Sequence, residues 1–312
     1  MIKLLQLIAK RIKEFFVFDE GIKLLLMAIP FILLIIAFSY IPLFGWVYAL
    51  YDYRAGIPLS KAPFIGFSKF MLIFKNGDEL LRILRNTLVL SSLAIFSTPL
   101  PVVFAIMLHE VKSISFKKVV QTTTTLPNFI SFILVYSLFF AIFSYDGLFN
   151  NILKILGLPV NTIGVMGNNN LTWVFQWFVS IWKTFGWNSI IYLMAISGID
   201  VELYNAAKVD GANKFKRIIH ITIPGLFSTF LVLLLLQISN LLNNGFDQYF
   251  VFYNALVAEK IEVLDYYIYK IGIRANDYSM ATALGIMKTL ISIMMLFIAN
   301  SISKRFRSES LF

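Results

Sequence analysis

Six stretches of mostly apolar residues divide this chain, and each is about as long as a bilayer-crossing helix, which needs about 20 apolar residues. Hydrophobic residues make up 59% of the 312 residues and charged residues 14%, so a soluble domain has too little interior to bury them. The sequence therefore predicts an all-α membrane protein with six transmembrane helices, at residues 24–48, 86–108, 126–144, 171–195, 223–243 and 281–303.

Lys and Arg residues are unevenly distributed between the segments that separate these spans. Fifteen lie in residues 1–23, 109–120, 199–222 and 304–312, whereas ten lie in the longer segments 51–85, 145–172 and 244–280. Because cytoplasmic loops are enriched in Lys and Arg, we expect a multi-pass protein of the cell membrane with both termini in the cytoplasm. The net charge of +10 is then a signal of topology, and we expect no nucleic-acid partner.

The chain is predicted to form one transmembrane domain, residues 24–303, between a cytoplasmic N-terminal segment, 1–23, and a cytoplasmic tail, 304–312. The apolar residues of 2–16 fall on one helical face, which favours an amphipathic helix on the inner leaflet over a solvated basic tail. The outer segment 51–85 is rich in Gly and Pro and is not expected to form one long helix, whereas 145–170, rich in Gly and Asn, is expected to be irregular. Part of residues 257–271 is compatible with a short helix parallel to the membrane.

Residues 199–222 form a charged segment between the fourth and fifth spans, and their pattern is typical of two short helices joined by a turn. Asp200 is placed to cap the first helix, and Glu202 lies in its first turn, where negative charge is favourable. Gly211 interrupts the pattern, which allows a turn or a close backbone approach. Pro224 opens the fifth span, where its missing N–H costs little.

The order of small residues in this segment resembles the EAA loop of permease subunits of ABC importers. Ala206-Ala207 is followed after three residues by Gly211, and after nine more by Ile221, one residue and Ile223-Pro224. Residues 198–204 and 243–312 are similar to the polysaccharide-type branch of the carbohydrate-uptake permeases, so the resemblance covers essentially the whole chain. It implies the type I ABC importer permease fold, with cytoplasmic coupling helices that dock on an ATP-hydrolysing subunit.

The resemblance assigns ATPase coupling to seven residues of the 199–222 loop: Glu202, Asn205, Ala206, Ala207, Asp210, Gly211 and Phe215. One position departs from the family's pattern, because Asn205 stands where Glu is usual. A neutral amide makes a weaker hydrogen bond than a carboxylate does. We therefore expect Glu202, one turn earlier on roughly the same face, to take over part of that role.

Polar and aromatic side chains within the spans are the candidates for a substrate path. Polar groups in a bilayer are costly and usually face a partner or a water-filled cavity, although they also join helices to one another. Hydrogen-bond donors next to aromatic rings suit a sugar, and the candidates are Tyr136, Phe140, Lys183, Trp187, Asn188, Asn240, Asn243, Asn244 and Asp247. The uncharged candidates favour a neutral oligosaccharide, while Lys183 leaves room for an acidic one. Lys288 is expected to extend toward the membrane surface and is given no role.

The resemblance also implies the partners: a second permease subunit in a heterodimer, two ATPase subunits that bind ATP and Mg, and an extracellular solute-binding protein, lipid-anchored, that delivers an oligosaccharide. The chain has no G-x-x-x-x-G-K-[ST] motif, so we expect neither ATP hydrolysis nor a cofactor in it. It also has no cysteine, and its two histidines do not have metal-ligand spacing. An ion-coupled secondary transporter is the alternative, but it typically has acidic residues in mid-span, which the predicted spans do not show. An integral-membrane enzyme needs a cluster of His, Asp or Glu, which is not visible either.

Overall fold

The computed structural model describes residues 20–75, 77–160 and 163–307, so the predicted helix of 2–16 lies outside the described residues. Within them the regular structure is helical, apart from one isolated bridge between Tyr51 and Phe64. Five helical stretches in this part of the chain are long and apolar enough to cross a membrane: Leu24–Leu50, Gly77–His109, Phe132–Ile155, Lys214–Ser239 and Tyr278–Ser301. A sixth, Asn169–Ser197, passes the same test together with the helix that follows it, which agrees with the six predicted spans.

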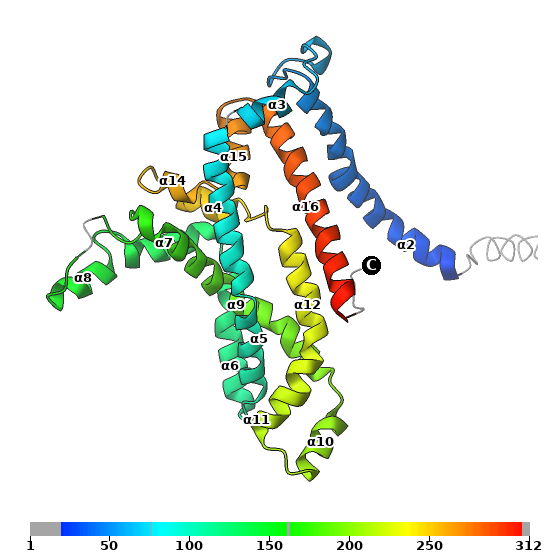
Figure 1. Ribbon diagram of the computed structural model, residues 1–312, viewed down its shortest axis with the longest axis vertical. Helices are drawn as coiled ribbons and strands as arrows, with labels where there is room; N and C mark the ends of the chain where they lie inside the picture. The colour runs from blue at the N-terminus through cyan, green and yellow to red at the C-terminus, as the bar shows by residue number, and fades with distance from the viewer. Residues whose placement is uncertain (1–19, 76, 161–162, 308–312) are drawn as a thin grey trace, which may run out of the picture.

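The first span stands apart from the other helices along most of its length (Figure 1). It comprises α2 (Glu20–Ile35), the π-helix η1 (Ile36–Tyr40) and the 3₁₀-helix η2 (Ile41–Leu50). Only η2 packs closely on the last span, and Ala49 is the one buried residue among the described residues of these three elements. Its apolar side chains are therefore left for lipid or for another chain.

The second span is longer than predicted, because helix begins well before residue 86. After η3 (Leu59–Lys61), α3 (Ser68–Lys75) and α4 (Gly77–Phe96) occupy much of the outer segment 51–85, which is therefore not one long helix, as expected. The span then breaks and continues as α5 (Pro99–His109). The break follows from the prolines of this stretch, which have no N–H to donate to the preceding turn.

The third span begins at Phe132, later than predicted, and a separate helix precedes it. Residues assigned to an inner loop form α6 (Ile114–Thr125), which is joined to α7 (Phe132–Phe143) by the 3₁₀-helix η4 (Leu126–Phe129). The following segment, expected to be irregular, contains α8 (Leu148–Ile155) and η5 (Asn169–Leu171). Sequence reasoning missed α6 because its charged and Thr-rich sequence lacks the apolar period of a membrane helix.

Helix α9 (Thr172–Ser197) runs through the centre of the molecule and packs on α4, α5, α6 and α12. A bend of 68° separates it from α10 (Val201–Val209), and α11 (Lys214–Arg217), the π-helix η6 (Ile218–Thr222) and α12 (Ile223–Ser239) follow. The two short helices lie together at the lower tip of the molecule (Figure 1). The helix–turn–helix predicted for this segment is confirmed.

Between α12 and the last span the chain forms a series of short helices: α13 (Asp247–Phe252), α14 (Ala258–Ile261), α15 (Leu264–Tyr269) and the π-helix η7 (Lys270–Arg274). The helix expected within 257–271 is therefore broken into pieces, and it is buried instead of lying on the surface, since Ile261 and Val263 are fully buried. The last span, α16 (Tyr278–Arg307), extends beyond the predicted end at residue 303.

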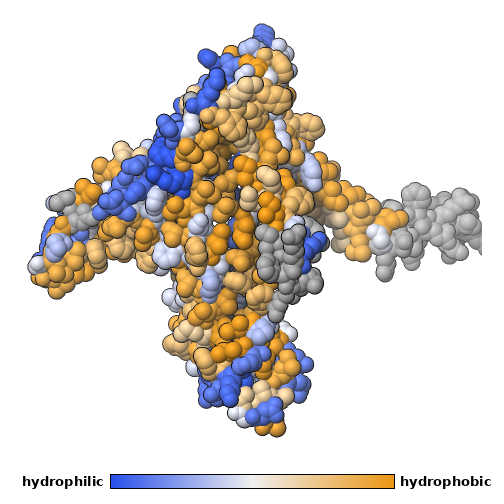
Figure 2. Space-filling model, viewed as in Figure 1, coloured by the Kyte–Doolittle hydropathy of each residue, from blue (hydrophilic) through white to orange (hydrophobic). Residues whose placement is uncertain are grey.

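An aromatic core joins α7, α9 and α13. Phe139 contacts the rings of Phe175 and Phe252 edge-on, and all three are buried. Outside this core, much of the face shown in Figure 2 is apolar over the spans, with hydrophilic residues gathered near the tips. Such a surface is expected where lipid replaces water as the solvent.

Candidate functional site

The loop 199–222 is shaped by hydrogen bonds within its own backbone. Asp200 caps α10, and its side-chain oxygen accepts a bond of 2.9 Å from the N–H of Glu202, as predicted. At the other end the N–H of Ala212 donates to the carbonyl of Ala207 at 2.8 Å, and the N–H of Gly211 donates to that of Lys208 at 3.1 Å. This pair of bonds is the Schellman ending of a helix, which requires a left-handed residue, and Gly211 has φ of +74°.

The side chains of this loop are largely exposed, including apolar ones. Val209 is 89% exposed, Phe215 69% and Leu203 53%. Of the other predicted coupling residues, Glu202, Asn205, Ala206, Asp210 and Gly211 are exposed and Ala207 is half-buried. Large apolar side chains exposed on a charged loop are candidates for a contact with another protein.

Two contacts fix this loop to the helices above it. The hydroxyl of Tyr204 on α10 lies 2.9 Å from that of buried Thr222, at the end of η6. Lys214 at the start of α11 forms an ion pair of 3.2 Å with Glu110, which follows α5. The loop is therefore connected to α5 by the ion pair and to α9 and α12 along the chain.

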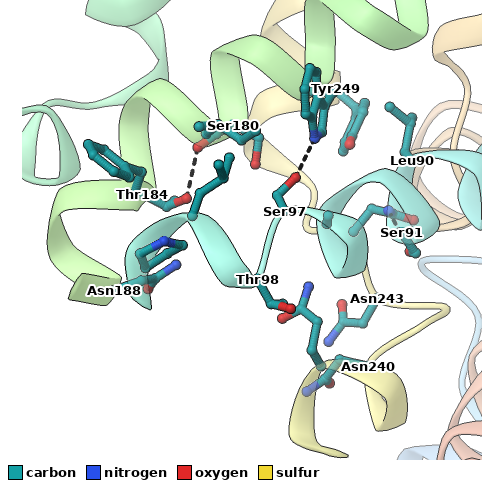
Figure 3. A pocket seen from close by; sticks show the side chains of 18 residues that line it. Leu90, Ser91, Ser97, Thr98, Ser180, Thr184, Asn188, Asn240, Asn243 and Tyr249 are labelled. Atoms are coloured by element: carbon teal, nitrogen blue, oxygen red, sulfur yellow. Dashed lines mark hydrogen bonds between the residues drawn. The ribbon is translucent and has the colours of Figure 1, made fainter. Parts of the chain in front are cut away.

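A cavity of about 250 Å³ lies between the α4–α5 break, α9 and the end of α12 (Figure 3). Its polar lining residues are Ser91, Ser97, Thr98, Ser180, Thr184, Asn188, Gln237, Asn240, Asn243 and Asn244. Neither Lys, Arg, Asp nor Glu is among the described residues that line it. Hydroxyl and amide groups both donate and accept hydrogen bonds, which suits a neutral, hydroxyl-rich molecule.

Breaks in the helices turn these small polar groups toward the cavity. At the α4–α5 break, the Ser97 hydroxyl accepts a hydrogen bond of 2.6 Å from the indole N–H of Trp177 on α9. Beyond the end of α12, the amide of Asn244 donates to the Ser91 hydroxyl at 2.9 Å, and that hydroxyl donates to a backbone carbonyl of the same segment. The amide oxygen of Asn244 is buried and has no hydrogen-bond partner among the described residues.

The structure brings four of the predicted substrate-path residues to this cavity, namely Asn188, Asn240, Asn243 and Asn244. Sequence reasoning missed the five hydroxyl side chains of Ser91, Ser97, Thr98, Ser180 and Thr184. Ser and Thr are common in membrane helices as packing residues, so they carry little signal by themselves. The prolines after Thr98 were the available signal, because a helix break inside a span is tolerated where the backbone lines a cavity or is buried in protein.

Lys183 was expected on the substrate path, and the structure places it elsewhere. Its ammonium group donates to the carbonyls of Pro127, Asn128 and Ile130 at 3.0, 2.9 and 2.6 Å, and the residue is 7% exposed. These carbonyls belong to η4 and the turn after it, and that of Pro127 also accepts a bond of 3.2 Å from the N–H of Ile130. The positive charge thus caps the break between α6 and α7 and does not line the cavity.

Four other predicted path residues also lie outside the lining of this cavity. Tyr136 packs on Phe252 in the aromatic core, and Phe140 stacks beside it while remaining half exposed. Trp187 is exposed and contacts Phe129 edge-on, and Asp247 is exposed at the start of α13. The spacing of residues along the sequence was not enough to distinguish the helix face that lines the cavity from the face that packs on other helices.

A buried acidic residue, Glu262, links the α14–α15 segment to its neighbours. Its carboxylate forms ion pairs of 2.6 Å with Arg82 on α4 and 2.7 Å with Lys270 on η7, and Glu262 is 1% exposed. Burial alone would lower the pKa of Lys270, but the hydrogen bond and charge of Glu262 raise it above its ordinary value. With both oxygens engaged by cations, this carboxylate serves as a structural anchor.

Residues 97–308 match the family model of the binding-protein-dependent transport system inner membrane component. The chain belongs to this family. It is a permease subunit of an ABC importer, a multi-pass protein of the inner membrane, and it is not itself an ATPase. The matched region includes the loop 199–222 and both helices that flank it.

Individual relatives cover nearly the whole chain. It is 38% identical over 293 residues to Protein LplB of Bacillus subtilis (strain 168), covering 93% of this chain and 91% of the relative. It is 34% identical over 299 residues to the polygalacturonan/rhamnogalacturonan transport system permease protein YteP of the same organism, covering 93% and 90%. A chain of a bacterial alginate ABC transporter, solved with an alginate pentasaccharide-bound periplasmic protein, superimposes with a TM-score of 0.83 at 32% identity, covering 94% and 97%.

Proposed function

We propose that this permease imports an oligosaccharide, that the cavity between α4–α5, α9 and α12 is part of the translocation path, and that the loop 199–222 is the handle by which an ATPase moves it. The main support for this proposal is that the cavity and the loop are connected by the same helices. Helix α9 lines the cavity and ends at the loop, and α12 begins after the loop and lines the cavity with its far end. The same two helices therefore flank the loop and contribute to the lining of the cavity.

The polar lining supports a saccharide as the cargo. Asn188 and Asn240 present amides with Thr98 between them, and Ser180 and Thr184 lie on the same helix as Asn188 (Figure 3). Relatives transport saccharides according to their names, among them polygalacturonan/rhamnogalacturonan and arabinooligosaccharides. A rather polar wall also agrees with an alternating-access path, since such a path must be hydrated when it opens to either side.

The partners follow from what this chain lacks on its own. A single subunit leaves the cavity open on one side and the first span exposed, so a second permease subunit, in a heterodimer, is proposed to close the path. Two ATPase subunits would bind ATP and Mg and grip one coupling loop each. An extracellular solute-binding protein, lipid-anchored, would deliver the oligosaccharide to the end of the subunit that is opposite the loop. Both termini and the loop would then lie in the cytoplasm.

The test is reconstitution of the complete importer in proteoliposomes, with uptake of a labelled oligosaccharide measured as a function of enclosed ATP. The proposal expects uptake only when ATP, ATPase subunits and binding protein are all present. Accumulation driven by an ion gradient in vesicles that lack the ATPase would support the secondary-transporter alternative instead.

A paired variant tests the loop as the docking surface. Val209→Asp places a charge on the most exposed apolar residue of the loop, and Ile155→Asp does the same at an equally exposed position on α8, at 89% and 85%. Copurification of the ATPase should fall at least tenfold for the first and remain unchanged for the second. Equal copurification by both variants would remove the loop from the docking surface.

A further inference from the structure

A second cavity lies on the other side of the α12 end, between α12, α15 and α16. Its volume is about 490 Å³, and it shares Asn240 and Asn243 with the first cavity. Polar side chains dominate the shared edge and continue onto α16 at Thr289 and Ser292. The two cavities therefore form neighbouring subsites along one polar surface.

This second cavity contains a charge pair, which the first does not. Lys288 on α16 and Asp265 on α15 are the only charged side chains among the described residues that line either cavity. They form an ion pair with each other, and their side chains are 17% and 13% exposed. Lys288 therefore does not extend to the membrane surface, contrary to the expectation from its sequence position.

The contacts of Lys288 leave part of its ammonium group available to a ligand. It donates to Asp265 Oδ1 and to Asn243 Oδ1, the latter at 3.2 Å. An ammonium group has three donors, so one remains for a molecule in the cavity that Lys288 lines. Asp265 is held in place independently, because its other oxygen accepts a bond of 3.0 Å from the N–H of Gly245.

Lys183, in contrast to Lys288, has no donor left for a ligand. Its three donors are all taken by backbone carbonyls, which cannot move away without breaking the η4 turn. Lys288 is held by two side chains, and side chains can change rotamer. A cation with a free donor and exchangeable partners can exchange one acceptor for another.

We propose that Lys288 is a specificity-determining residue for a carboxylate-bearing sugar unit, a uronate, and that Asp265 is the resident counter-ion that the sugar's carboxylate displaces. This inference rests on the proposed function and names the substrate class of that same path. A sugar hydroxyl and a sugar carboxylate can both accept from the ammonium group, but only the carboxylate adds the attraction between opposite charges, so the acidic sugar gains most from the third donor.

The counter-ion explains how such a site can both bind and release its cargo. With Asp265 in place the empty cavity carries no net charge. The free-energy cost of an unpaired lysine charge in the membrane is therefore avoided. The sugar's carboxylate competes with Asp265 for the ammonium group, which limits its affinity. A transport site must bind strongly enough to admit the solute and weakly enough to let it leave.

The test uses two probes that differ only in charge: trigalacturonate and the same trisaccharide with its carboxyl groups reduced. Binding of each is measured by titration calorimetry on the purified importer complex without the binding protein, whose own selectivity would obscure the result. The quantity compared between variants is the ratio of the two dissociation constants.

Two substitutions should move this ratio in opposite directions. Lys288→Met leaves Asp265 uncompensated and should lower the preference for trigalacturonate about tenfold, the value of one charge-assisted hydrogen bond. Asp265→Asn keeps an acceptor for Gly245 but removes the competing charge, and should raise the preference severalfold. Lys288→Arg keeps the charge and should retain more than half of the preference.

Equal changes for both probes, or no change, would overturn the inference while leaving the proposed function intact. If the Lys288→Met complex does not assemble, Asp265→Asn alone decides, because it is nearly isosteric with the native residue. Failure of the wild-type importer to bind or transport either saccharide would instead reject the proposed function, and this inference with it.

Discussion

The surroundings of Lys183, within the span of α9, and the loop around Gly211, after that span, satisfy their polar groups in opposite ways. Lys183 is 7% exposed and binds three carbonyls of the same chain, and the backbone of Thr124 lies against Gly186 one turn later. In the loop, Val209 is 89% exposed, and a Cβ at Gly211 would meet nothing within 4 Å. The first region is complete within this subunit, whereas the second is built to be completed by another protein.

This difference predicts which measurement each region controls. Substitutions around Lys183 should lower the stability of the subunit itself. Substitutions in the loop should leave stability unchanged and reduce coupling to the ATPase. The variants below are designed to break that separation, starting with the largest expected effect.

Lys183→Met is expected to be the most damaging. It removes the ammonium group that donates to three carbonyls at and after η4. The carbonyl of Pro127 keeps its bond from the N–H of Ile130, but a buried polar group left without a partner costs about 1–3 kcal/mol. We expect a loss of about 3–5 kcal/mol, seen as a lower melting temperature of the detergent-solubilised subunit. Lys208→Met, in the exposed part of the loop, is the matched control and should melt with the wild type. Equal melting of all three proteins would show that Lys183 is not a structural cap.

Gly211→Val should show the converse behaviour. A left-handed conformation costs a residue with a side chain about 1–2 kcal/mol, and Gly56 provides a control because its φ of +87° is similar and its surroundings are equally open. Gly56→Val should carry the same strain at the opposite end of the molecule. Both variants should reach the membrane, but only Gly211→Val should lose ATPase association in copurification. Normal sugar uptake by Gly211→Val would defeat the coupling role.

The loop could be predicted from sequence because its signals are local. Asp200 as a cap, the helix after it and a glycine at the turn each depend on a few neighbouring residues, and the structure contains all three. The number of spans was also predictable, since length and apolarity determine it. Backbone propensity and the thickness of the bilayer were enough for both.

The substrate wall was only partly predictable because it depends on tertiary contacts. Asn240, Asn243 and Asn244 were found because amides are rare in membrane helices, whereas Ser97 and Thr98 are unremarkable until the helix break turns them inward. The positions of Lys183 and Lys288 both differ from those expected, because Lys183 caps a helix break and Lys288 lines a cavity. Position along a span does not reveal that η4 presents three carbonyls to one lysine, or that α15 folds back to place Asp265 beside the other.

Within the loop, Glu202→Ala should reduce coupling more than Asn205→Ala. Both side chains are exposed, so neither truncation should affect stability, but a carboxylate gives about 1.5–3 kcal/mol in a charge-assisted hydrogen bond against about 0.5–1.5 kcal/mol for an amide. We expect a drop of about tenfold or more in substrate-stimulated ATPase activity for the first and a severalfold drop for the second. Comparable losses would count against the idea that Glu202 replaces the usual Glu of this family.

The smallest expected effect comes from a contact within the loop that ties α10 to the residue before α12. Tyr204→Phe keeps the ring on α10 but removes the hydroxyl that lies 2.9 Å from Thr222, so the loop is less firmly tied to the start of α12. A neutral hydrogen bond is worth about 0.5–1.5 kcal/mol, which predicts a loss of about two- to tenfold in coupling, measured as sugar transported per ATP hydrolysed. Tyr145→Phe, an exposed position before α8, is the control for loss of a hydroxyl. If Tyr204→Phe instead lowered the melting temperature and left the coupling ratio unchanged, this hydrogen bond would belong to the stability of the subunit, and the boundary between the two regions would lie within the loop.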